Sequence, residues 1–215
     1  MKKNEYFDLY CKIRNSESSE MQKIRKSLSD KFPSFFSSDD YLACNDTDPS
    51  LLKFFFNTFF RGKLVKIYAW AITDPTAIKE IVKVSKDIGI VEIGAGGGYW
   101  ASILASYGVN VAAYDIWKDE NVGFYHPVGK AGEKAILKHQ DRALFLCWPP
   151  YATLMAYNSV VKYKGNTIIY IGEDKGGCNA DDKFFDYVSN KFKLDSIIHM
   201  AKWDSLYDNL YIYRR

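Results

Sequence analysis

Four glycines and a carboxylate in one short stretch have the types and spacing of a nucleotide-binding turn. Residues 90–100 read Ile-Val-Glu-Ile-Gly-Ala-Gly-Gly-Gly-Tyr-Trp, a β-branched run that leads through glycines into a helix-forming segment. Gly94 permits a tight turn without a Cβ clash, and Gly96 lets the backbone approach a ligand. The helix that follows directs its free N–H groups at whatever is bound. The pattern predicts a strand–turn–helix unit that holds a nucleotide or nucleoside.

A second carboxylate follows at the distance that such a site needs. Asp115 ends the run Val109–Asp115, which is predicted as the next strand. In dinucleotide-binding folds an acidic residue about 20 positions beyond the glycines accepts hydrogen bonds from ribose hydroxyls. We therefore expect Asp115 to bind a ribose.

Two ligand classes use this kind of turn, and the spacing distinguishes them. Nicotinamide and flavin sites favour Gly-x-Gly-x-x-Gly, whose third glycine allows close helix packing, but Tyr99 occupies that position here. The chain has instead an acidic residue, Glu92, two positions before the first glycine. A carboxylate is favourable beside a cation and unfavourable beside phosphates. A glycine turn without this ligand, in another doubly wound fold, is the alternative.

Together with the flanking strand, the helix and Asp115, the spacing Glu-x-Gly-x-Gly-x-Gly resembles the first motif of the class I S-adenosylmethionine-dependent methyltransferases. The resemblance covers roughly residues 68–215 and implies S-adenosylmethionine as the cofactor. It implies that Asp115 binds the ribose and that the methionine part is held by Glu92, Gly94, Ala95, Gly96 and Gly98. Family members often have Asp or Asn after the third strand for the adenine amino group. This chain has Pro-Val-Gly-Lys at 127–130, so the adenine-binding residue is not identified.

A second constellation, Cys-Trp-Pro-Pro-Tyr at 147–151, follows the predicted fourth strand. In a doubly wound sheet the ligand lies where the strand order reverses, between the first and fourth strands, so this turn should face the reactive group. Two prolines restrict the backbone and preorganise the turn. The turn is similar to the Asn-Pro-Pro-Tyr turn of amino-methylating enzymes. Trp148 replaces the Asn, and an indole donates a hydrogen bond but cannot accept one.

We expect the catalytic contacts of this turn to come from Trp148, from the carbonyl of Pro149 and from the ring of Tyr151. The alternative for the two aromatic residues is ordinary packing. Cys147 is expected to line the cofactor site. Its thiol is either a nucleophile or, as is more usual at the end of an apolar strand, an inert buried group.

Two aromatic residues and one carboxylate complete the candidate set. Tyr68 and Trp70 precede the first strand, where the chain of many family members folds over the cofactor, so we expect both to cover the pocket; packing in the core is the alternative. Glu173 follows the predicted fifth strand and is expected at the rim of the site, as a base or as a ligand for a substrate amine. A solvated loop carboxylate is the alternative.

The elements that must position these residues alternate from Ile88 onward, as in a sheet covered by helices on both faces. The expected strands are 90–93, 109–114, 125–128, 143–147, 167–171, 194–200 and 210–213, and the expected helices are 99–107, 131–139, 152–163 and 181–192. The last two strands are joined by a loop without a crossover helix and should be antiparallel. We predict an α/β fold, a Rossmann-like, doubly wound, seven-stranded mixed sheet of the class I methyltransferase type.

Residues 1–66 are predicted as an N-terminal helical extension, in front of an S-adenosylmethionine-binding methyltransferase domain at 67–215. Asp-Pro-Ser at 48–50 is a typical helix start, and Gly62 is predicted to end that helix. Its Phe-rich stretch has an apolar face at helical spacing, which favours a helix packed on the sheet; a membrane-surface or lid helix is the alternative. The segment 16–50 is expected to be the least regular part.

Composition limits the classes of function. At 215 residues, 47% hydrophobic and 26% charged, the chain has the composition of a soluble globular domain. A net charge of +3 gives no strong signal for nucleic acid or an anionic membrane. No apolar run reaches the roughly 20 residues of a bilayer span, and the start lacks a signal-peptide stretch, so a cytoplasmic location is expected. The four cysteines form no Cys-x-x-Cys pair, and no metal site is predicted.

The sequence thus predicts an S-adenosylmethionine-dependent methyltransferase that acts on an acceptor of unknown class, either a small or planar molecule or a side chain. A non-catalytic protein of the same fold that acts by binding a partner is the alternative. The intact glycine turn disfavours that alternative, and Trp148 favours it. A nicotinamide oxidoreductase is a third possibility, disfavoured by Tyr99. The oligomeric state is left open.

Overall fold

The computed structural model describes residues 2–36, 49–116 and 124–215, except for the side chains of 18 and 49–57. The chain divides into two compact units. One is Asn4–Tyr68, and the other is Ala69–Arg215 together with Lys2 and Lys3. The division thus lies two residues beyond the boundary that the sequence predicts.

The first unit is helical. Its elements are α1 (Glu5–Arg14), α2 (Ser18–Lys31), the 3-10 helix η1 (Pro33–Phe35) and α3 (Pro49–Ile67). Tyr6 stacks on Tyr68, with ring centroids 5.1 Å apart, and Phe32 meets the same Tyr68 ring edge-on. The helix α2 falls within the segment that was expected to be least regular, so that expectation is wrong for residues 18–31. Residues 37–48 of the segment lie outside the described residues.

Helix α3 corrects a second prediction. It begins at Pro49 as predicted, but it does not end at Gly62 and continues to Ile67. A glycine ends a helix by adopting a positive φ, and Gly62 is not among the glycines that do so. A glycine inside a helix costs about 1 kcal/mol relative to alanine. Burial of Phe60 and Leu64, one on either side of it, offsets that cost.

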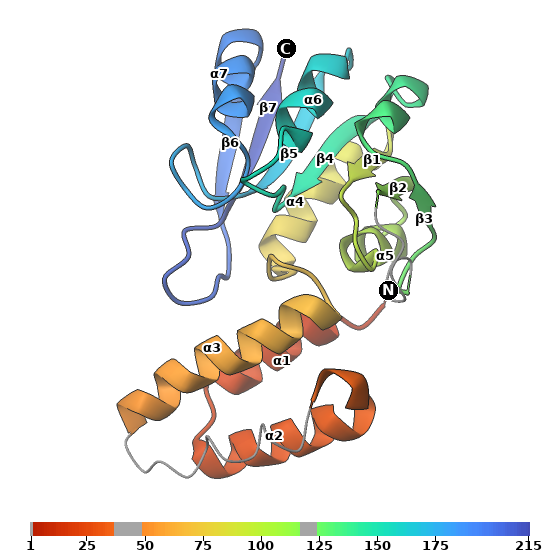
Figure 1. The fold of residues 1–215 in the computed structure, drawn as a ribbon. Helices are drawn as coiled ribbons and strands as arrows, with labels where there is room; N and C mark the ends of the chain where they lie inside the picture. The colour runs from red at the N-terminus through yellow and green to blue at the C-terminus, as the bar shows by residue number, and fades with distance from the viewer. Residues whose placement is uncertain (1, 37–48, 117–123) are drawn as a thin grey trace. The chain divides into compact units, whose positions relative to one another are not determined.

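The second unit is built on one seven-stranded sheet with the order β3-β2-β1-β4-β5-β7-β6 (Figure 1). The strands are β1 (Ile90–Ile93), β2 (Val111–Asp115), β3 (Val128–Lys130), β4 (Ala143–Cys147), β5 (Thr167–Gly172), β6 (Lys193–His199) and β7 (Asn209–Arg214). Strand β7 runs antiparallel to both β5 and β6, and the other pairs are parallel. The predicted α/β fold, a Rossmann-like mixed sheet with a terminal antiparallel pair, is confirmed.

Helices cover both faces of this sheet. They are α4 (Pro75–Ser85), α5 (Tyr99–Ser106), the 3-10 helix η3 (Glu133–Lys138), α6 (Met155–Lys162) and α7 (Asp182–Lys191). Leu144 and Leu146 of β4 join the apolar cluster under α6 and α7, whereas Phe145 meets Trp100 of α5 edge-on. Alternate residues of the central strand are thus buried on opposite faces, which explains why β4 and β5 read as continuous apolar runs.

Two elements on one side of the sheet differ from the prediction. The expected helix at 131–139 is the 3-10 helix η3, and the third strand is Val128–Lys130 rather than 125–128. Only three residues of this edge strand pair with β2. The backbone N–H of Tyr125 donates to the carbonyl of Gly97 instead, at 2.9 Å. The segment before β3 is therefore held by the glycine turn, a tertiary contact that local propensity does not encode.

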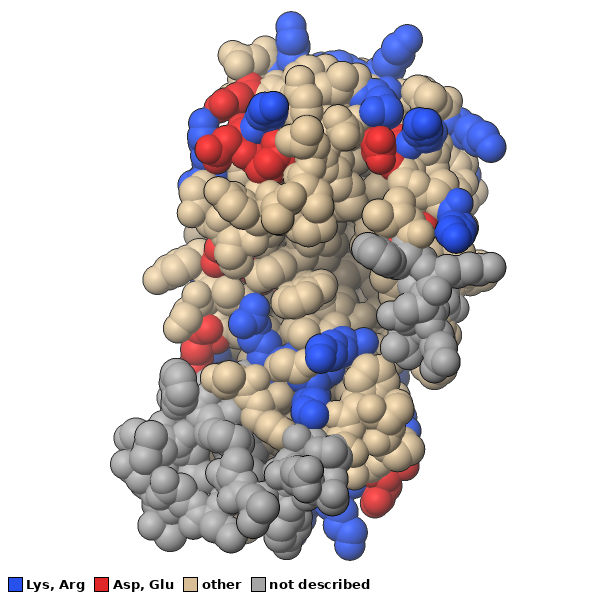
Figure 2. Space-filling model, in the orientation of Figure 1, with Lys and Arg blue, Asp and Glu red and all other residues tan. Residues whose placement is uncertain are grey.

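Charged side chains are unevenly placed on the sheet unit. Figure 2 shows acidic residues gathered over α7 and few charges near the carboxyl end of β4, where the face is hollowed.

Among the described helices, none combines the length and the apolar character that crossing a bilayer requires.

Candidate functional site

The glycine turn is fastened to the end of the neighbouring strand. Gly94 and Ala95 donate their N–H groups to the carbonyl of Tyr114, at 2.8 and 3.1 Å. The N–H of Gly96 donates to Oδ2 of Asp115 at 2.9 Å. The structure therefore brings together the turn and the carboxylate that the sequence placed on two different strands.

The three glycines with positive φ in the turn differ in what a Cβ at each position would contact. A Cβ at Gly94 would lie 3.0 Å from Cε of Met155, and one at Gly98 would lie 3.0 Å from the carbonyl oxygen of His126. A Cβ at Gly96 would meet nothing within 4 Å. Gly94 and Gly98 are therefore required by the packing of the protein itself. Gly96 faces the open space that a ligand would fill.

Glu92 lies buried behind this turn with an unsatisfied oxygen. It is 2% exposed, and its Oε2 has no hydrogen-bond partner among the described residues. Burial and, to a smaller extent, the negative charge of Asp115 together raise the pKa of Glu92 to about 8. A buried carboxyl of this kind is costly when it is ionised and unpaired. A cation bound over the turn would remove that cost.

The aromatic turn, residues 147–151, lies at the same edge of the sheet. Residues 90–92 of β1 pair with 143–145 of β4, and continuing this register places Gly94 level with Cys147. Burial raises the pKa of the Cys147 thiol well above its usual range, and the charges of Glu92 and Asp208 add to the effect. The thiol is protonated at neutral pH, so the structure favours an inert group over a nucleophile.

Trp148 adopts an unusual backbone conformation that three contacts hold. Its φ is 53°, in the left-handed region that bulky residues rarely occupy. Its N–H donates to the carbonyl of Ile171 at 2.8 Å, and its indole Nε1 donates to Oδ1 of Asp208 at 2.8 Å. Its ring stacks on Trp70, with centroids 5.2 Å apart and planes 10° apart. Two residues that the sequence assigned to different roles thus form one stacked pair.

The prolines of the turn are used differently from the expectation. The carbonyl of Pro149 accepts the N–H of Ala180 at 2.8 Å, and Pro150 pairs with Asn179 in an isolated antiparallel bridge. The N–H of Ala180 thus engages one lone pair of the Pro149 carbonyl, and the expected role of that carbonyl as an acceptor for substrate hydrogens stays a prediction for the other. Tyr151, by contrast, is 57% exposed.

Glu173 is a buried clamp. Its Oε1 accepts the N–H of Tyr207 at 2.9 Å, and its Oε2 accepts the N–H of Cys178 at 2.8 Å. The alternative of a solvated loop carboxylate is wrong, because Glu173 is buried and its two oxygens accept N–H groups from two loops. Its expected role as a base or as a ligand for a substrate amine stays a prediction. Burial, then the hydrogen bond and charge of Glu173, raises the pKa of the Cys178 thiol to about 11.

Two further polar residues of this region were missed. Asn179 is buried, and its Oδ1 accepts both the hydroxyl of Tyr170 at 2.9 Å and the N–H of Glu173 at 2.8 Å. Asp208, 1% exposed, is the acceptor that holds Trp148. Both lie in loops without hydrophobic periodicity or a motif. No signal in the sequence distinguishes them from other loop Asn and Asp residues.

Tyr68 and Trp70, predicted to cover the pocket together, fall in different units. Tyr68 packs on Tyr6 within the helical unit, as in the alternative of a core aromatic. Trp70 belongs to the sheet unit and is 51% exposed. Within the described part of the chain, no three His, Cys, Asp or Glu side chains are grouped as a metal ion would require.

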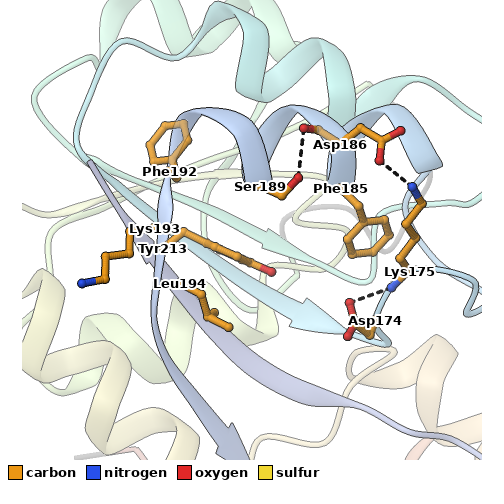
Figure 3. A pocket seen from close by; sticks show the side chains of 9 residues that line it. All are labelled: Asp174, Lys175, Phe185, Asp186, Ser189, Phe192, Lys193, Leu194 and Tyr213. Atoms are coloured by element: carbon orange, nitrogen blue, oxygen red, sulfur yellow. Dashed lines mark hydrogen bonds and ion pairs between the residues drawn. The ribbon is translucent and has the colours of Figure 1, made fainter.

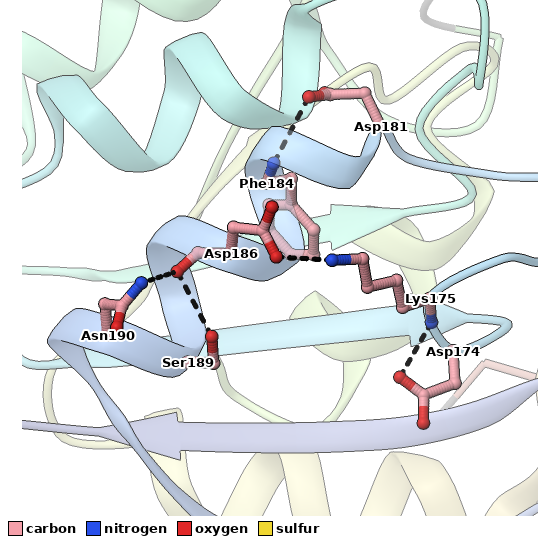
Figure 4. Close-up of polar contacts among 7 residues, drawn as sticks. All are labelled: Asp174, Lys175, Asp181, Phe184, Asp186, Ser189 and Asn190. Carbon is pink, nitrogen blue, oxygen red and sulfur yellow. Dashed lines mark hydrogen bonds and ion pairs between the residues drawn. The ribbon is translucent and has the colours of Figure 1, made fainter.

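A separate hollow of about 570 Å³ lies along α7, β6 and β7 (Figure 3). Phe185, Phe192, Leu194 and Tyr213 form its apolar walls. Three of the charged residues that line it contact one another: Lys175 pairs with Asp186, and the backbone N–H of Lys175 donates to Asp174 (Figure 4). Figure 4 also shows that Asp181 accepts the N–H of Phe184 and so caps α7. These contacts explain the geometry of the helix and assign no chemistry to the hollow.

No family model matches the sequence, and no curated protein matches it. Solved structures with a similar fold include a protein of the NADB-Rossmann superfamily from Streptococcus agalactiae, with 13% identity, a TM-score of 0.45, and coverage of 65% of this chain and 67% of that one. Magnesium protoporphyrin IX methyltransferase from Synechocystis PCC 6803 with bound SAM has 11% identity, a TM-score of 0.48, and coverage of 80% and 99%. A MtNAS variant in complex with S-adenosylmethionine has 13% identity, a TM-score of 0.48, and coverage of 97% and 95%.

Proposed function

We propose that the sheet unit binds S-adenosylmethionine and transfers its methyl group to an acceptor held at the aromatic turn. The observation that carries the proposal is the pair of buried carboxyls behind an open glycine turn. Asp115 holds the N–H of Gly96, and Glu92 has an oxygen without a partner among the described residues. Gly96 itself faces free space.

The charge of this pair supports a cationic nucleoside over a dinucleotide. The negative charge of Asp115 raises the pKa of Glu92, so the two groups lie close enough to repel each other. A pyrophosphate placed over the same turn would add negative charge beside them. A sulfonium and an ammonium group would instead favour ionised Glu92 and relieve the cost of its burial.

When bound, S-adenosylmethionine supplies an electrophilic methyl group whose transfer returns an electron pair to sulfur. In the proposed arrangement Asp115 orients the ribose, and the glycine turn and Glu92 orient the methionine part. The Trp148–Tyr151 turn holds the acceptor, a small or planar molecule or a side chain, and excludes water from it. Glu173 shapes this surface by fixing two loops. The acceptor nucleophile loses its proton to solvent, because the carboxylate of Glu173 is buried and each of its oxygens already accepts a backbone N–H.

The proposal is tested by calorimetric titration with S-adenosylmethionine, S-adenosylhomocysteine and NAD. We expect both sulfur ligands to bind and NAD to bind more weakly or not at all. At 100 times its Kd a ligand stabilises the fold by about 2.7 kcal/mol, which a thermal melt detects. Asp115→Ala should weaken binding at least about tenfold, since a hydrogen bond to a charged group contributes about 1.5–3 kcal/mol.

Asp115→Asn is the matched control, because it keeps an acceptor for Gly96 and should retain more affinity than Asp115→Ala. Preferential binding of NAD would contradict the proposal and support an oxidoreductase. Binding of none of the three ligands would also contradict it. That result would support a non-catalytic partner-binding protein. Among the alternatives this one is favoured because the Pro149 carbonyl and both Glu173 oxygens already accept backbone N–H groups.

A further inference from the structure

The stacked pair Trp70–Trp148 is unusual in being both rigid and exposed. One face of the Trp70 ring lies on Trp148, at 5.2 Å between centroids, yet half of the Trp70 side chain remains exposed. Because Trp148 covers the first face, the exposed area belongs largely to the second face and the edge. The pair therefore presents a flat apolar surface to solvent.

The protein maintains this surface at an energetic cost. A bulky residue with a positive φ has a strained backbone, and the φ of Trp148 is 53°. Strained residues of this kind persist where the surroundings fix them, and they cluster at functional sites. Here the fixing contact is the carboxylate of Asp208, which accepts the indole N–H at 2.8 Å from a fully buried position. Asp208 thus acts as a positioning residue for the ring of Trp148.

The surface lies at the edge of the sheet where the cofactor is proposed to bind. Trp148 directly follows Cys147, and the pKa of the Cys147 thiol is raised by the charges of both Glu92 and Asp208, so these groups are close together. Ala71, next to Trp70, contacts the same thiol through its backbone. Tyr151 adds a second exposed ring to the same turn. An occupant of the Trp70 face therefore lies next to the glycine-turn region.

We propose that the Trp70–Trp148 pair is a stacking platform for a planar aromatic or heteroaromatic ring. Stacking on an indole face rewards flat π-systems beyond their apolar area, whereas an aliphatic amine or a peptide side chain would use little of the platform. As a statement about the methyl acceptor, this inference rests on the proposed function and selects aromatic molecules within it. As a statement about ring binding, it is independent of the cofactor.

The test compares two neutral probes of one skeleton, naphthalen-2-ol and decahydronaphthalen-2-ol, by calorimetry and by NMR of the indole N–H signals. The measurements are made with and without S-adenosylhomocysteine. We expect the aromatic probe to bind about threefold to tenfold more tightly than the saturated one, which is the range that aromatic pairing contributes to affinity. It should shift the Trp70 and Trp148 signals and leave that of buried Trp203 unchanged.

Variants separate stacking from general apolar binding. Trp70→Leu and Asp208→Ala should reduce the affinity for naphthalen-2-ol to that for its saturated analogue. Asp208→Asn, which keeps an acceptor oxygen for the indole N–H, should restore most of the preference. Tyr107→Leu changes an exposed aromatic residue just beyond the carboxyl end of α5 and should have no effect.

The outcomes distinguish this inference from the proposed function. Equal affinity for the two probes, or indole shifts confined to other tryptophans, overturns the platform even where S-adenosylhomocysteine binds. Preferential binding of the aromatic probe in a protein that binds no sulfur ligand supports the platform and contradicts the proposed function. The NMR comparison on the unaltered protein gives this answer even if a variant fails to fold.

Discussion

Two regions lie at the same edge of one sheet. They are the glycine-turn region (Glu92–Gly98 with Asp115) and the aromatic-turn region (Cys147–Tyr151 with the loops that contact it). The two regions differ in how far their buried carboxyl groups are satisfied by hydrogen bonds. In the first, Gly96 faces open space and Oε2 of Glu92 has no partner among the described residues. In the second, Glu173 and Asp208 are both engaged by groups 34 and 60 residues away in the sequence.

The difference indicates a division of labour. Unsatisfied charge and open space are features of a site that is completed by a ligand. Satisfied hydrogen bonds and a strained, anchored ring are features of a surface that is rigid before anything binds. We therefore expect changes in the glycine-turn region to alter ligand binding and pH dependence. Changes in the aromatic-turn region should first alter stability.

Glu92→Gln gives the largest expected effect. The pKa of Glu92 is about 8 in the folded protein against an ordinary value of 4.5, so the folded state holds its proton more tightly. The resulting stability is complete below pH 4.5 and is lost as the pH rises through 8. Between pH 5 and pH 9 the free energy of unfolding should fall by up to roughly 5 kcal/mol more in the natural protein than in Glu92→Gln.

Urea unfolding of both proteins at pH 5, 7 and 9 measures this difference. Glu80→Gln on the outer face of α4 is the control and should follow the natural protein. Parallel pH profiles for the natural protein and Glu92→Gln would show that Glu92 is not a buried, unpaired carboxyl.

Asn179→Ala tests the aromatic-turn region by removing one acceptor that serves two buried donors. The N–H of Glu173 would lose its partner, whereas the hydroxyl of Tyr170 can still donate to the carbonyl of Glu173, 2.8 Å away. At about 1–3 kcal/mol for an unsatisfied buried group, we expect a loss of up to about 3 kcal/mol in the free energy of unfolding. Asn190→Ala, at the exposed end of α7, removes an exposed hydrogen bond that Asn190 donates to the carbonyl of Asp186 and should cost much less. Equal losses in the two variants would contradict the role of Asn179 as a buried acceptor that holds Glu173.

Gly96→Ala separates space from backbone strain. We expect roughly a 100-fold loss of S-adenosylhomocysteine affinity, about 2.7 kcal/mol, because the new methyl group occupies the ligand's space. The fold itself should lose only about 1 kcal/mol for the positive φ. Gly176→Ala has the same open surroundings and a positive φ, but lies in the loop after β5. It should therefore cost similar stability and leave calorimetric affinity unchanged; a similar affinity loss in both variants would place the ligand elsewhere.

Glu173→Gln should have a smaller effect, about 1–2 kcal/mol, because the amide keeps one acceptor oxygen for Cys178 or Tyr207 and loses the other. Chemical denaturation measures the loss, with exposed Asp174→Asn as its neighbour control. Once an acceptor substrate is identified, the pH profile of transfer should be unchanged in Glu173→Gln. A lost acidic limb of that profile would restore the role of a base.

Gly62→Ala lies outside both regions and sets the smallest change. Gly62 has helical backbone and free space for a Cβ, so the substitution should raise the stability of the helical unit by about 0.5–1 kcal/mol. Gly108→Ala, with φ of 87° after α5, should lower stability instead. A thermal melt of both variants checks the two signs. A decrease for Gly62→Ala would mean that the glycine is needed where it stands.

Much of the glycine-turn region could be predicted from the sequence because its contacts are local. The run from Ile90 to Trp100 contains the strand, the turn and the start of the helix. A single parallel pairing then places the end of β2, with Asp115, beside it. Gly98 is the exception. The residue is in the predicted motif, but a glycine is needed there because a Cβ would lie 3.0 Å from the carbonyl oxygen of His126.

The aromatic-turn region was only partly predictable. Residues 147–151 were recognised as a preorganised turn, and Trp148, Tyr151 and Glu173 were all singled out. Their surroundings were not, because each is set by a partner from another loop: Trp148 by Asp208, Pro149 by Ala180 and Glu173 by Tyr207. Such partners leave no periodic trace in the sequence. The same limit explains why the two alternatives for Glu173, a rim base and a solvated carboxylate, both missed a buried clamp.

The sequence by itself determined the strand and helix order, the antiparallel end of the sheet and the position of the glycine turn. Hydrophobic periodicity and glycine conformation act within a few residues, so these features are local. Only the tertiary structure decided the unpaired state of Glu92, the burial of Glu173 and the pairing of Trp70 with Trp148. Burial, and with it the raised pKa of Glu92 and the strain of Trp148, depends on which distant segments the sheet brings to one edge.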